Sequence, residues 1–442
     1  MDCPTHKEIV VVDIDKVRVP QPTPFDQISQ TETPPNSRPQ RPGQTRLTII
    51  SNQGVEQLTV IHKRTYDFTH DRPSVPADEQ IPLDEQGIRY NDDPSTSDLQ
   101  PSSYRSLPEI VGYKNGTDLV VQGSAQSTHP TGSMRVSVQV GNYRHTADVI
   151  GRRYCDYVKG QLVFTPPEPF EKMDLRYENA YGGRDQYFEK VLLTEIKNSA
   201  SSDDIRRVKP VAEAYLKNSP PLVYPRNCYG KGYVIEGNRQ SIEGRELPNL
   251  ERVDDRLTPE RLIVKNPLVW NKQPVPVGFD YLDVQSFPRS AMIGLPPAIA
   301  LNQEPVAEVS LALIPKDYCR GNVFSTPPAE LQNLIHPMAG RCASLGLWLP
   351  FLEGNEKIKL IGMDRHTPEY IVQLPCEKPH FIFNYPNMAS PLANAQLMLV
   401  CVDFNHHKLT LIWSARSILT KPMGENQLDD LLSTILIDIQ RV

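Results

Sequence analysis

The chain has 442 residues, enough for two or three domains with a buried core. Its net charge is -6, and without a concentrated basic region it gives no reason to expect a nucleic-acid partner. No apolar stretch approaches the ~20 residues of a membrane-spanning helix, and the N-terminus lacks the basic and apolar regions of a secretory signal. We therefore expect a cytoplasmic protein that does not insert into a membrane.

Proline content shapes the expected fold. The chain contains 42 prolines, roughly twice the usual ~5% of residues, and each one removes a backbone donor and ends helices. Two proline-rich segments, 20–45 and 70–108, sustain neither a helical nor a strand period, and we interpret them as long loops. Long helices are excluded from most of the chain.

The N-terminal half shows the apolar alternation and β-branched residues that are typical of strands. Residues 134–140 alternate along their whole length and turn at Gly141 and Asn142 into residues 144–150. Because Gly and Asn accept the positive φ angles of a tight turn, this segment predicts a β-hairpin. The strands predicted in this half are residues 7–19, 47–50, 58–61 continuing into 64–68, 118–121, 134–140, 144–150, 161–164 and 173–177.

The C-terminal half combines strands with three predicted helices. The first two helices are expected over 203–217 and 329–345. The third is expected over 426–440, and we interpret it as a helix packed on the last sheet, with a partner-binding helix as the alternative. Its apolar residues recur at helical spacing: Leu428, Leu431, Leu432, Ile435, Leu436 and Ile439. The predicted strands are 357–362, 370–374, 380–385, 396–404 and 408–414, with a hairpin turn between the last two.

This succession predicts a mainly β protein of two packed β-sandwich-like halves, with a few short helices and long proline-rich loops. The halves are an N-terminal β domain over 1–190 and a C-terminal β-rich domain over 191–442 that ends in the amphipathic helix. The hairpins at 134–150 and 396–414 have the same form, which favours two similar halves.

A search for catalytic or metal-binding residues finds no convincing group. The seven cysteines are scattered without a C-x-x-C pair, which indicates free thiols in a reducing compartment. A polar hairpin turn accounts for the adjacent His406 and His407. There is no G-x-S-x-G motif, and Gly230-Lys231-Gly232 lacks the spacing of a phosphate-binding loop. We expect no enzymatic activity, no cofactor and no metal.

One segment carries a family resemblance. Residues 169–183, with the sequence PFEKMDLRYENAYGG, resemble the signature PF..mPL.yerAyGG of a bacterial family of domains of unknown function, DUF2169. Tyr154 stands where this family usually has Trp, and Cys228 where it has Pro. Further segments resemble its other motifs in the same order: residues 118–125, 149–154, 227–233, 247–251, 274–279, 352–374 and 411–416.

The resemblance implies a role beside the type VI secretion machine. Members of the family act as adaptors or chaperones that stabilise a toxic effector and help to load it onto the secreted spike. For this chain the resemblance implies a bacterial, cytoplasmic adaptor whose partner is an effector or a spike protein of the VgrG or PAAR type. No catalytic residues come with the family.

The motifs supply the candidate partner-binding residues, for which a structural role is the alternative. Glycines there can supply positive φ angles, and the tyrosines can pack their rings in a core. Trp270 is a further candidate, because an exposed Trp in a loop is a typical hot-spot residue. The candidates from the motifs are Tyr177, Glu178, Tyr181, Gly182, Gly183, Asn249 and Glu251.

Two other function classes stay open at this point. A β-sandwich carbohydrate-active hydrolase or binding protein requires a pair of carboxylates across a cleft, and its usual aromatic platforms are sparse in a chain with 7% aromatic residues. An immunity protein is the third possibility, for which we expect a smaller chain. The sequence favours an adaptor that holds a partner segment by β-edges and loop aromatics.

Overall fold

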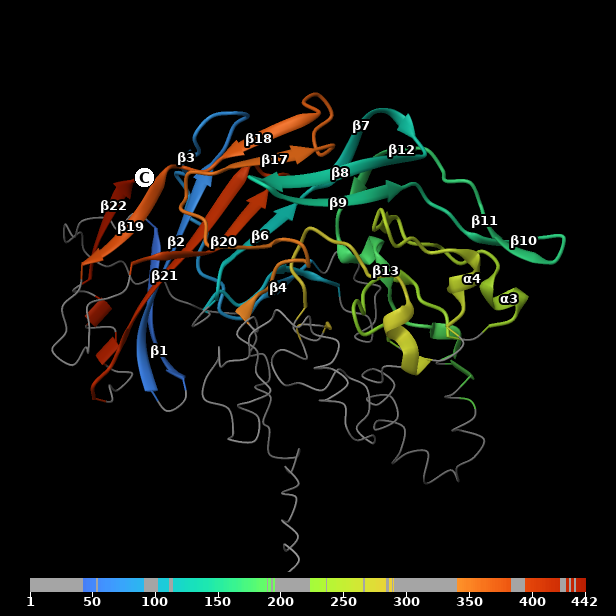
Figure 1. The fold of residues 1–442 in the computed structure, drawn as a ribbon, viewed down its shortest axis with the longest axis horizontal. Helices are drawn as coiled ribbons and strands as arrows, with labels where there is room; N and C mark the ends of the chain where they lie inside the picture. The colour runs from blue at the N-terminus through green and yellow to red at the C-terminus, as the bar shows by residue number, and fades with distance from the viewer. Residues whose placement is uncertain are drawn as a thin grey trace, which may run out of the picture. The chain divides into compact units, whose positions relative to one another are not determined.

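The structure is a computed structural model. It describes residues 43–52, 55–90, 102–110, 114–188, 190–191, 194, 223–235, 237–264, 267–283, 286–287, 289, 340–382, 394–421, 427–428, 431–432 and 435–442. These residues belong to one compact unit, Arg41–Val442. The unit is mainly β, as the sequence predicts (Figure 1).

The largest sheet has seven strands and contains two long hairpins, one from the N-terminal part of the chain and one from the C-terminal part. Its main order is β1 (Gln44–Asn52), β2 (Val55–Asp67), β21 (Lys408–Ile418), β20 (Gln396–Asp403), β6 (Thr117–Gln122) and β16 (Trp348–Leu349), with β3 (Val75–Pro76) paired to β2. Neighbours are antiparallel except β20 and β6, which run parallel. All six residues of β6 are buried, and β6 pairs with strands on both of its edges.

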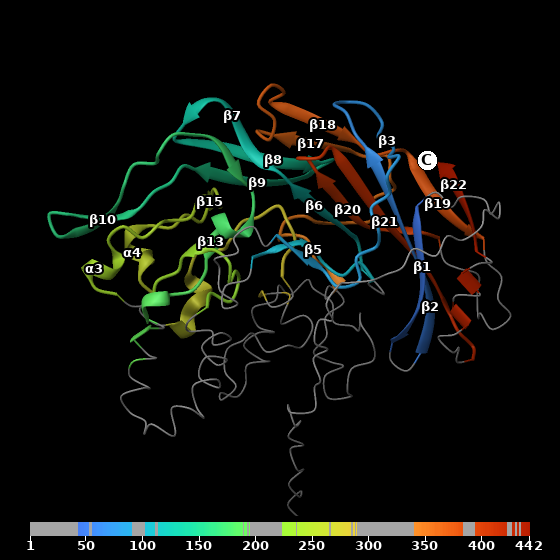
Figure 2. The ribbon, with the colours of Figure 1, turned by 180° about the vertical axis from the view of Figure 1, so that it is seen from behind.

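The second sheet has five strands and is built around the predicted hairpin at 134–150. Its order is β15 (Leu250–Glu251), β9 (Tyr143–Ile150), β8 (Ser133–Val140), β17 (Lys357–Ile361) and β18 (Glu369–Gln373). Figure 2 shows β15 beside β9 from behind. The outer edge of β18 is covered, since the backbone N–H groups of Asp71 and Ser74 donate to carbonyls of Ile371 and Gln373.

The predicted division at residue 190 does not separate these sheets. In the first sheet β20 and β21 pair with β6 and β2, and in the second sheet β17 pairs with β8. Each sheet therefore combines strands from both sides of residue 190, and the described unit does not split there. The local alternation that predicts each strand carries no information about which distant strand it pairs with.

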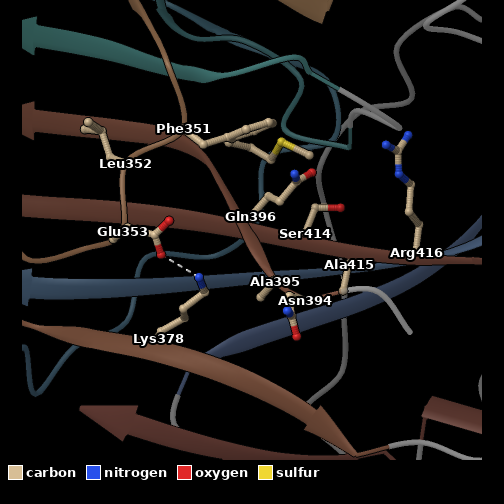
Figure 3. A pocket seen from close by; sticks show the side chains of 11 residues that line it. Phe351, Leu352, Glu353, Lys378, Asn394, Ala395, Gln396, Ser414, Ala415 and Arg416 are labelled. Atoms are coloured by element: carbon tan, nitrogen blue, oxygen red, sulfur yellow. Dashed lines mark hydrogen bonds and ion pairs between the residues drawn. The ribbon is translucent and has the colours of Figure 1, made fainter. Parts of the chain in front are cut away.

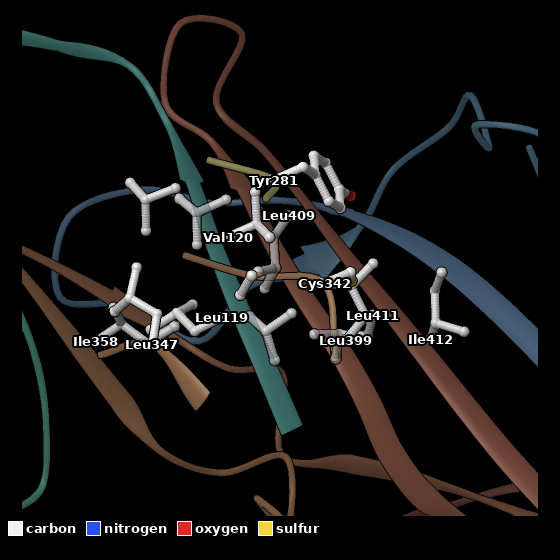
Figure 4. Close-up of a cluster of buried hydrophobic side chains, with 14 of the residues drawn as sticks. Leu119, Val120, Tyr281, Cys342, Leu347, Ile358, Leu399, Leu409, Leu411 and Ile412 are labelled. Atoms are coloured by element: carbon white, nitrogen blue, oxygen red, sulfur yellow. The ribbon is translucent and has the colours of Figure 1, made fainter. Parts of the chain in front are cut away.

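One buried cluster takes side chains from both large sheets (Figure 4). Leu119 of β6, Leu411 of β21 and Ile358 of β17 are at most 1% exposed and belong to this cluster. The aromatic rings of Phe404 and Tyr370 meet edge to face at 4.9 Å and link the two sheets at one end. Truncating a fully buried leucine such as Leu119 to alanine costs about 2–5 kcal/mol.

The remaining elements are short. The strand pairs are β10 (Cys155–Val158) with β11 (Gln161–Phe164), β12 (Phe170–Asp174) with β7 (Ser124–Thr131), β13 (Tyr181–Gly182) with β14 (Lys231–Gly232), β4 (Ile88–Arg89) with β5 (Tyr104–Ser106), and β19 (Glu377–Ile382) with β22 (Leu436–Arg441). The short helices are α3 (Arg239–Ile242) and α4 (Pro259–Leu262), and the 3₁₀ turns are η2 (Tyr177–Asn179) and η3 (Pro267–Lys272).

The predicted C-terminal helix over 426–440 is wrong in its second half. Residues 427–428 and 431–432 are helical, but Leu436–Arg441 form β22 and pair antiparallel with β19. Ile435, Ile437 and Ile439 also alternate with period two, and β-branched residues favour strands. Leu436, which the helical interpretation places on the apolar face, is 61% exposed.

Several other predictions fall wholly or partly on residues outside the described ranges. The strand at 7–19 and the helix at 203–217 lie outside the described residues. The helix at 329–345 is described only from residue 340, and 341–345 are not helical. The loop at 20–45 is described only from residue 43, and β1 already begins at Gln44. The described parts of 70–108 are irregular apart from β3, β4 and β5.

The strand predictions for the rest of the chain are largely confirmed. The hairpins at 134–150 and 396–414 are present, and the strand predicted from 58–61 into 64–68 is β2. The five described cysteines are free, with Cys155 and Cys342 buried. Within the described ranges no helix has the length and apolar character needed to cross a membrane.

Candidate functional site

The motif at 169–183 folds into a turn that only glycine permits. After η2, the strand β13 pairs in parallel with β14, so the backbones of the two motifs at 177–183 and 227–233 lie against each other. Gly183 has a φ of +89°, and a Cβ on it would overlap the carbonyl oxygen of Gly230. A side chain at this position is therefore excluded both by the backbone conformation and by the close approach.

Two buried asparagines hold the motifs together. The side chain of Asn227 donates to the carbonyls of Tyr177 and Tyr181, at 2.8 and 3.1 Å. The side chain of Asn249 donates to the carbonyl of Ile150 at 2.9 Å, and its backbone N–H donates to Asn179. Each amide thus adds buried side-chain hydrogen bonds to the backbone carbonyls of the motifs.

The motif at 247–251 contributes a buried ion pair. The Arg153 guanidinium lies 2.8 Å from the carboxylate of Glu251, whose side chain is 2% exposed. Burial raises the pKa of Glu251 above its ordinary value, while the Arg153 charge and hydrogen bond act in the opposite direction. The pair joins the end of β9 to β15 and has no direct access to a partner.

Tyr177 and Glu178, two further candidates from the motif at 169–183, form hydrogen bonds to other segments of the chain. The Tyr177 hydroxyl donates to Ser344 at 2.9 Å, and the Ser344 hydroxyl donates to the carbonyl of Asp280 at 2.7 Å. The Glu178 carboxylate accepts from the backbone N–H and the hydroxyl of Ser103, at 2.6 and 2.9 Å. Both motif side chains therefore act inside the molecule.

The prediction of an exposed anchor at Trp270 is wrong. Trp270 is 5% exposed and belongs to a second buried cluster, in which its ring meets Phe287 at 5.1 Å and Tyr224 at 6.4 Å. The Arg226 guanidinium covers the ring at 5.3 Å. The polar, proline-rich neighbourhood of Trp270 concealed this cluster, whose aromatic members come from distant parts of the chain.

The structure thus brings the predicted site residues together as a scaffold, of which Asn249 and Gly182 also line open hollows. Tyr177, Tyr181, Gly182, Gly183, Asn249, Glu251 and Trp270 are buried, and Glu178 is partly buried. Their direct contact with a partner stays a prediction that this burial does not favour.

An open groove, which we call the motif groove, lies over this scaffold. It consists of two hollows of about 680 and 610 Å³ that share Lys231 and Glu246. The first hollow is lined by Arg152, Glu168, Pro169, Phe170, Lys172, Met173, Asp174, Asn179 and Asn249 besides the shared pair. The second is lined by Gly182, Gly230, Gly232, Tyr187, Lys190 and Arg245, among others.

The charges of the motif groove are only partly compensated. Lys231 and Glu246 form an ion pair of 2.5 Å, and Arg245 lies 3.0 Å from the buried Asp185. Three other cations in the lining, Arg152, Lys172 and Lys190, have no carboxylate partner among the described residues. Glu168 is the carboxylate of the lining without a cationic partner in that same part of the chain.

A buried polar cluster around Asp280 was not predicted from the sequence. The Asp280 carboxylate accepts from the Tyr90 hydroxyl at 2.5 Å and from the Gln122 side chain at 3.0 Å. Burial raises the pKa of Asp280 to about 7, although the hydrogen bonds from Gln122, Tyr90 and its neighbouring backbone N–H lower it. Tyr90 follows β4, Gln122 ends β6 and Asp280 lies in a loop, so no local pattern links them.

A second buried charge cluster stabilises the start of β6. The Asp118 carboxylate lies 2.7 Å from the Lys114 ammonium and 3.4 Å from the Arg341 guanidinium. Burial alone would raise the pKa of Asp118, but the two cations hold it below its ordinary value. Among the described residues there is no group of three or more His, Cys, Asp or Glu side chains that could hold a metal ion.

Comparison with known proteins adds the family. Residues 53–414 match the family DUF2169, described as an uncharacterized protein conserved in bacteria, and the chain belongs to this family. Comparisons with curated proteins and with solved structures found no match.

Proposed function

We propose that this protein is a non-enzymatic adaptor that binds a type VI secretion effector or a spike protein of the VgrG or PAAR type in the bacterial cytoplasm. It would stabilise this partner and assist its loading for secretion. The observation that carries the proposal is the motif groove, because residues of four family motifs line it and leave it open along two adjoining hollows. An open groove of this kind suits a polypeptide segment.

The charge of the motif groove indicates which kind of segment it holds. Some charged groups of the lining have no ion-pair partner among the described residues. Three of them are cations, Arg152, Lys172 and Lys190, and one is a carboxylate, Glu168. Complementary charge raises the rate of association and suppresses wrong partners. We propose that the partner segment is acidic.

The hydrolase alternative draws on the same groove and is less well supported. Three carboxylates line the first hollow, Glu168, Asp174 and Glu246. Asp174 already accepts from Arg176 and Ser124, and Glu246 from Lys231. Glycoside hydrolysis needs two carboxyl groups that face the substrate. Turnover of aryl glycosides that is lost in Glu168→Gln would favour this alternative instead.

The adaptor proposal is tested by deleting the gene in the native bacterium. Mass spectrometry of the soluble fraction and of the culture medium should show one effector that loses at least tenfold in one or both fractions. Complementation with the wild-type gene or with Arg72→Glu, an exposed cation outside the groove, should restore it. The triple variant Arg152→Glu, Lys172→Glu, Lys190→Glu should not. Effectors that stay equally soluble and equally secreted without this chain contradict the proposal.

A further inference from the structure

The strand β12 has a neighbouring strand on one edge only. It pairs with β7, and these two strands form a sheet of their own. Among the described residues no strand pairs with the other edge of β12, which we call the free edge. An unpaired edge presents a row of backbone N–H and C=O groups, to which a strand of another chain can bind.

The first hollow of the motif groove lies along this free edge. Its lining includes two runs of consecutive residues, 168–170 and 172–174. Successive side chains of a strand point to opposite faces, so a hollow over one face would be lined by every second residue. Consecutive residues therefore indicate a hollow beside the strand. No residue of β7 lines it, which places the hollow on the side away from β7.

The hydrogen bonds around Asp174 show which way its backbone points. The N–H of Leu175 donates to the carbonyl of Gly123 at 3.0 Å, so Leu175 faces the β7 side. In an antiparallel pair, residues alternate between facing the neighbouring strand and facing away from it. Asp174 therefore faces the free edge, where its carbonyl accepts from the Asn179 side chain at 2.9 Å.

The backbone of Lys172 faces the free edge as well. Lys172 stands opposite Gln126 in the ladder, and the N–H of Gln126 donates to Gly362 instead of to β12. Residues opposite each other in an antiparallel ladder either both face one another or both face away. The N–H and C=O groups of Lys172 and the N–H group of Asp174 have no hydrogen-bond partner among the described residues.

The side chains along the free edge favour an acidic segment. Arg152 and Lys172 line the first hollow without a carboxylate partner in the described part of the chain, against Glu168 as the carboxylate without a cation. The other carboxylates of this hollow already belong to ion pairs. Phe170 and Met173 add apolar surface. Complementary charge suppresses wrong partners, so the excess of cations selects acidic side chains.

We infer that the partner adds an acidic strand to the free edge of β12. One residue of the added strand would exchange both backbone hydrogen bonds with Lys172, and the residue two positions away would accept from the N–H of Asp174. Acidic side chains would contact Arg152 and Lys172. This inference rests on the proposed function in taking the ligand to be a protein, and it adds the way in which the ligand binds.

A pair of proline variants tests the backbone directions. Lys172→Pro removes an N–H that faces the groove, and proline is tolerated on a strand edge that faces solvent, so this variant should keep the wild-type melting temperature. Met173→Pro removes an N–H that faces β7 and should lower the melting temperature. An equal loss in both variants would contradict the assigned directions.

The binding test uses the full chain and the fluorescein-labelled peptide Glu-Val-Glu-Val-Glu-Val, read by fluorescence anisotropy. We expect saturable binding, and binding at least tenfold weaker for Lys-Val-Lys-Val-Lys-Val. Two further forms are N-methylated at all valines or at all glutamates. One of them should bind at least tenfold more weakly and the other like the parent peptide, because only alternate N–H groups of an added strand face β12.

Variants of the full chain separate the backbone from the charge. Lys172→Pro should weaken the acidic peptide about tenfold, whereas Lys172→Gln, which keeps the N–H, should weaken it about threefold. The matched control is Lys378→Gln, which removes a lysine from a separate pocket at the start of β20. Lys378 there pairs with Glu353 at 2.6 Å, drawn as a dashed line in Figure 3. This control should bind the peptide normally.

Several outcomes overturn the inference. Equal binding of the parent peptide and both N-methylated forms would exclude an added strand, and this result needs only the wild-type chain. No saturable binding up to about 1 mM peptide would exclude the acidic segment. A protein that stabilises its effector in the native bacterium but gives either result overturns this inference alone. Peptide binding that requires the N–H of Lys172, in a protein that stabilises no effector, leaves the inference standing and contradicts the proposed function.

Discussion

Lys231 and Glu246 lie 2.5 Å apart at the point where the two hollows of the motif groove meet. Lys231 comes from β14, in the motif at 227–233, and Glu246 directly precedes the motif at 247–251, so the pair joins these two segments of the groove lining. Both side chains keep access to solvent, at 22% and 39%. Partly exposed ion pairs contribute little to stability. We therefore expect this pair to affect partner binding rather than folding.

Lys231→Gln should therefore separate binding from folding. We expect the free energy of unfolding in urea to change by no more than about 1 kcal/mol. The Kd for the captured partner should rise about tenfold. The matched control is Lys359→Gln, which breaks the exposed pair with Glu369 on the second sheet and should leave the Kd unchanged. Equal Kd values for both variants would contradict a role of the groove in binding.

The glycine turn of the motif can be tested with a pair of alanine variants. Gly183 and Gly160 have similar φ angles, +89° and +82°, but only Gly183 has a neighbouring backbone where a Cβ would stand. Gly160→Ala should cost about 1–2 kcal/mol from the left-handed conformation alone. Gly183→Ala should cost about 1–3 kcal/mol more because it adds an overlap. Thermal unfolding followed by circular dichroism measures the difference, and equal losses would show that the turn tolerates a side chain.

The buried charge cluster at Asp118 should be sensitive to the loss of its carboxylate. Asp118→Asn leaves the charges of Lys114 and Arg341 buried without an anion, which costs about 3–5 kcal/mol. Asp254→Asn is the control, because Asp254 pairs with Arg252 at the exposed surface, and this variant should unfold at the wild-type urea concentration. A loss below about 1 kcal/mol for Asp118→Asn would contradict the pairing.

Asp280 makes stability depend on pH in an unusual direction. Its pKa in the folded protein, about 7, lies above the ordinary value of 3.8, so the unfolded chain releases its proton first as pH rises. Stability should fall by up to about 4 kcal/mol between pH 4 and 7 from this group and stay level above. Glu178 also raises the pKa of Asp280, and Asp280 in turn raises that of Cys401.

The variant Asp280→Asn removes this dependence while keeping a group that can bond to Tyr90 and Gln122. The difference in unfolding free energy between variant and wild type should shift in favour of the variant as pH rises from 4 to 7. Urea titrations at each pH measure it. A difference that stays constant over this range would show that Asp280 titrates at its ordinary pKa.

The local sequence pattern predicted where the strands lie but not which strands pair with each other. The alternation of residues 134–140 with its Gly141 turn is sufficient to identify β8 and β9, because half-buried strands alternate with period two. Residues 435–441 satisfy helical and strand spacing at once, and only the pairing of Phe381 with Ile437 in β19 and β22 decides between them. For the same reason, no local pattern could show that a sheet combines strands from both sides of residue 190, such as β6 and β20, which lie far apart in sequence.

The site was accessible to sequence analysis only in part. The family motifs located the scaffold, because glycines and asparagines at fixed spacing carry a backbone requirement that can be recognised locally. Whether such residues face a partner or the core depends on burial, and Trp270 shows that a polar neighbourhood does not decide it. Arg152, Lys172 and Lys190 form the cationic lining of the groove only after folding, so they gave no signal in the sequence.

The most direct test of the adaptor account is capture of the tagged full chain from its native bacterium, with mass spectrometry of the bound proteins. We predict that one effector or spike protein is recovered in near-stoichiometric amount by the wild type and by Arg72→Glu. The folded triple variant Arg152→Glu, Lys172→Glu, Lys190→Glu should lose it. Recovery of no specific protein by the stable wild-type chain, or equal recovery by the triple variant, would contradict the account.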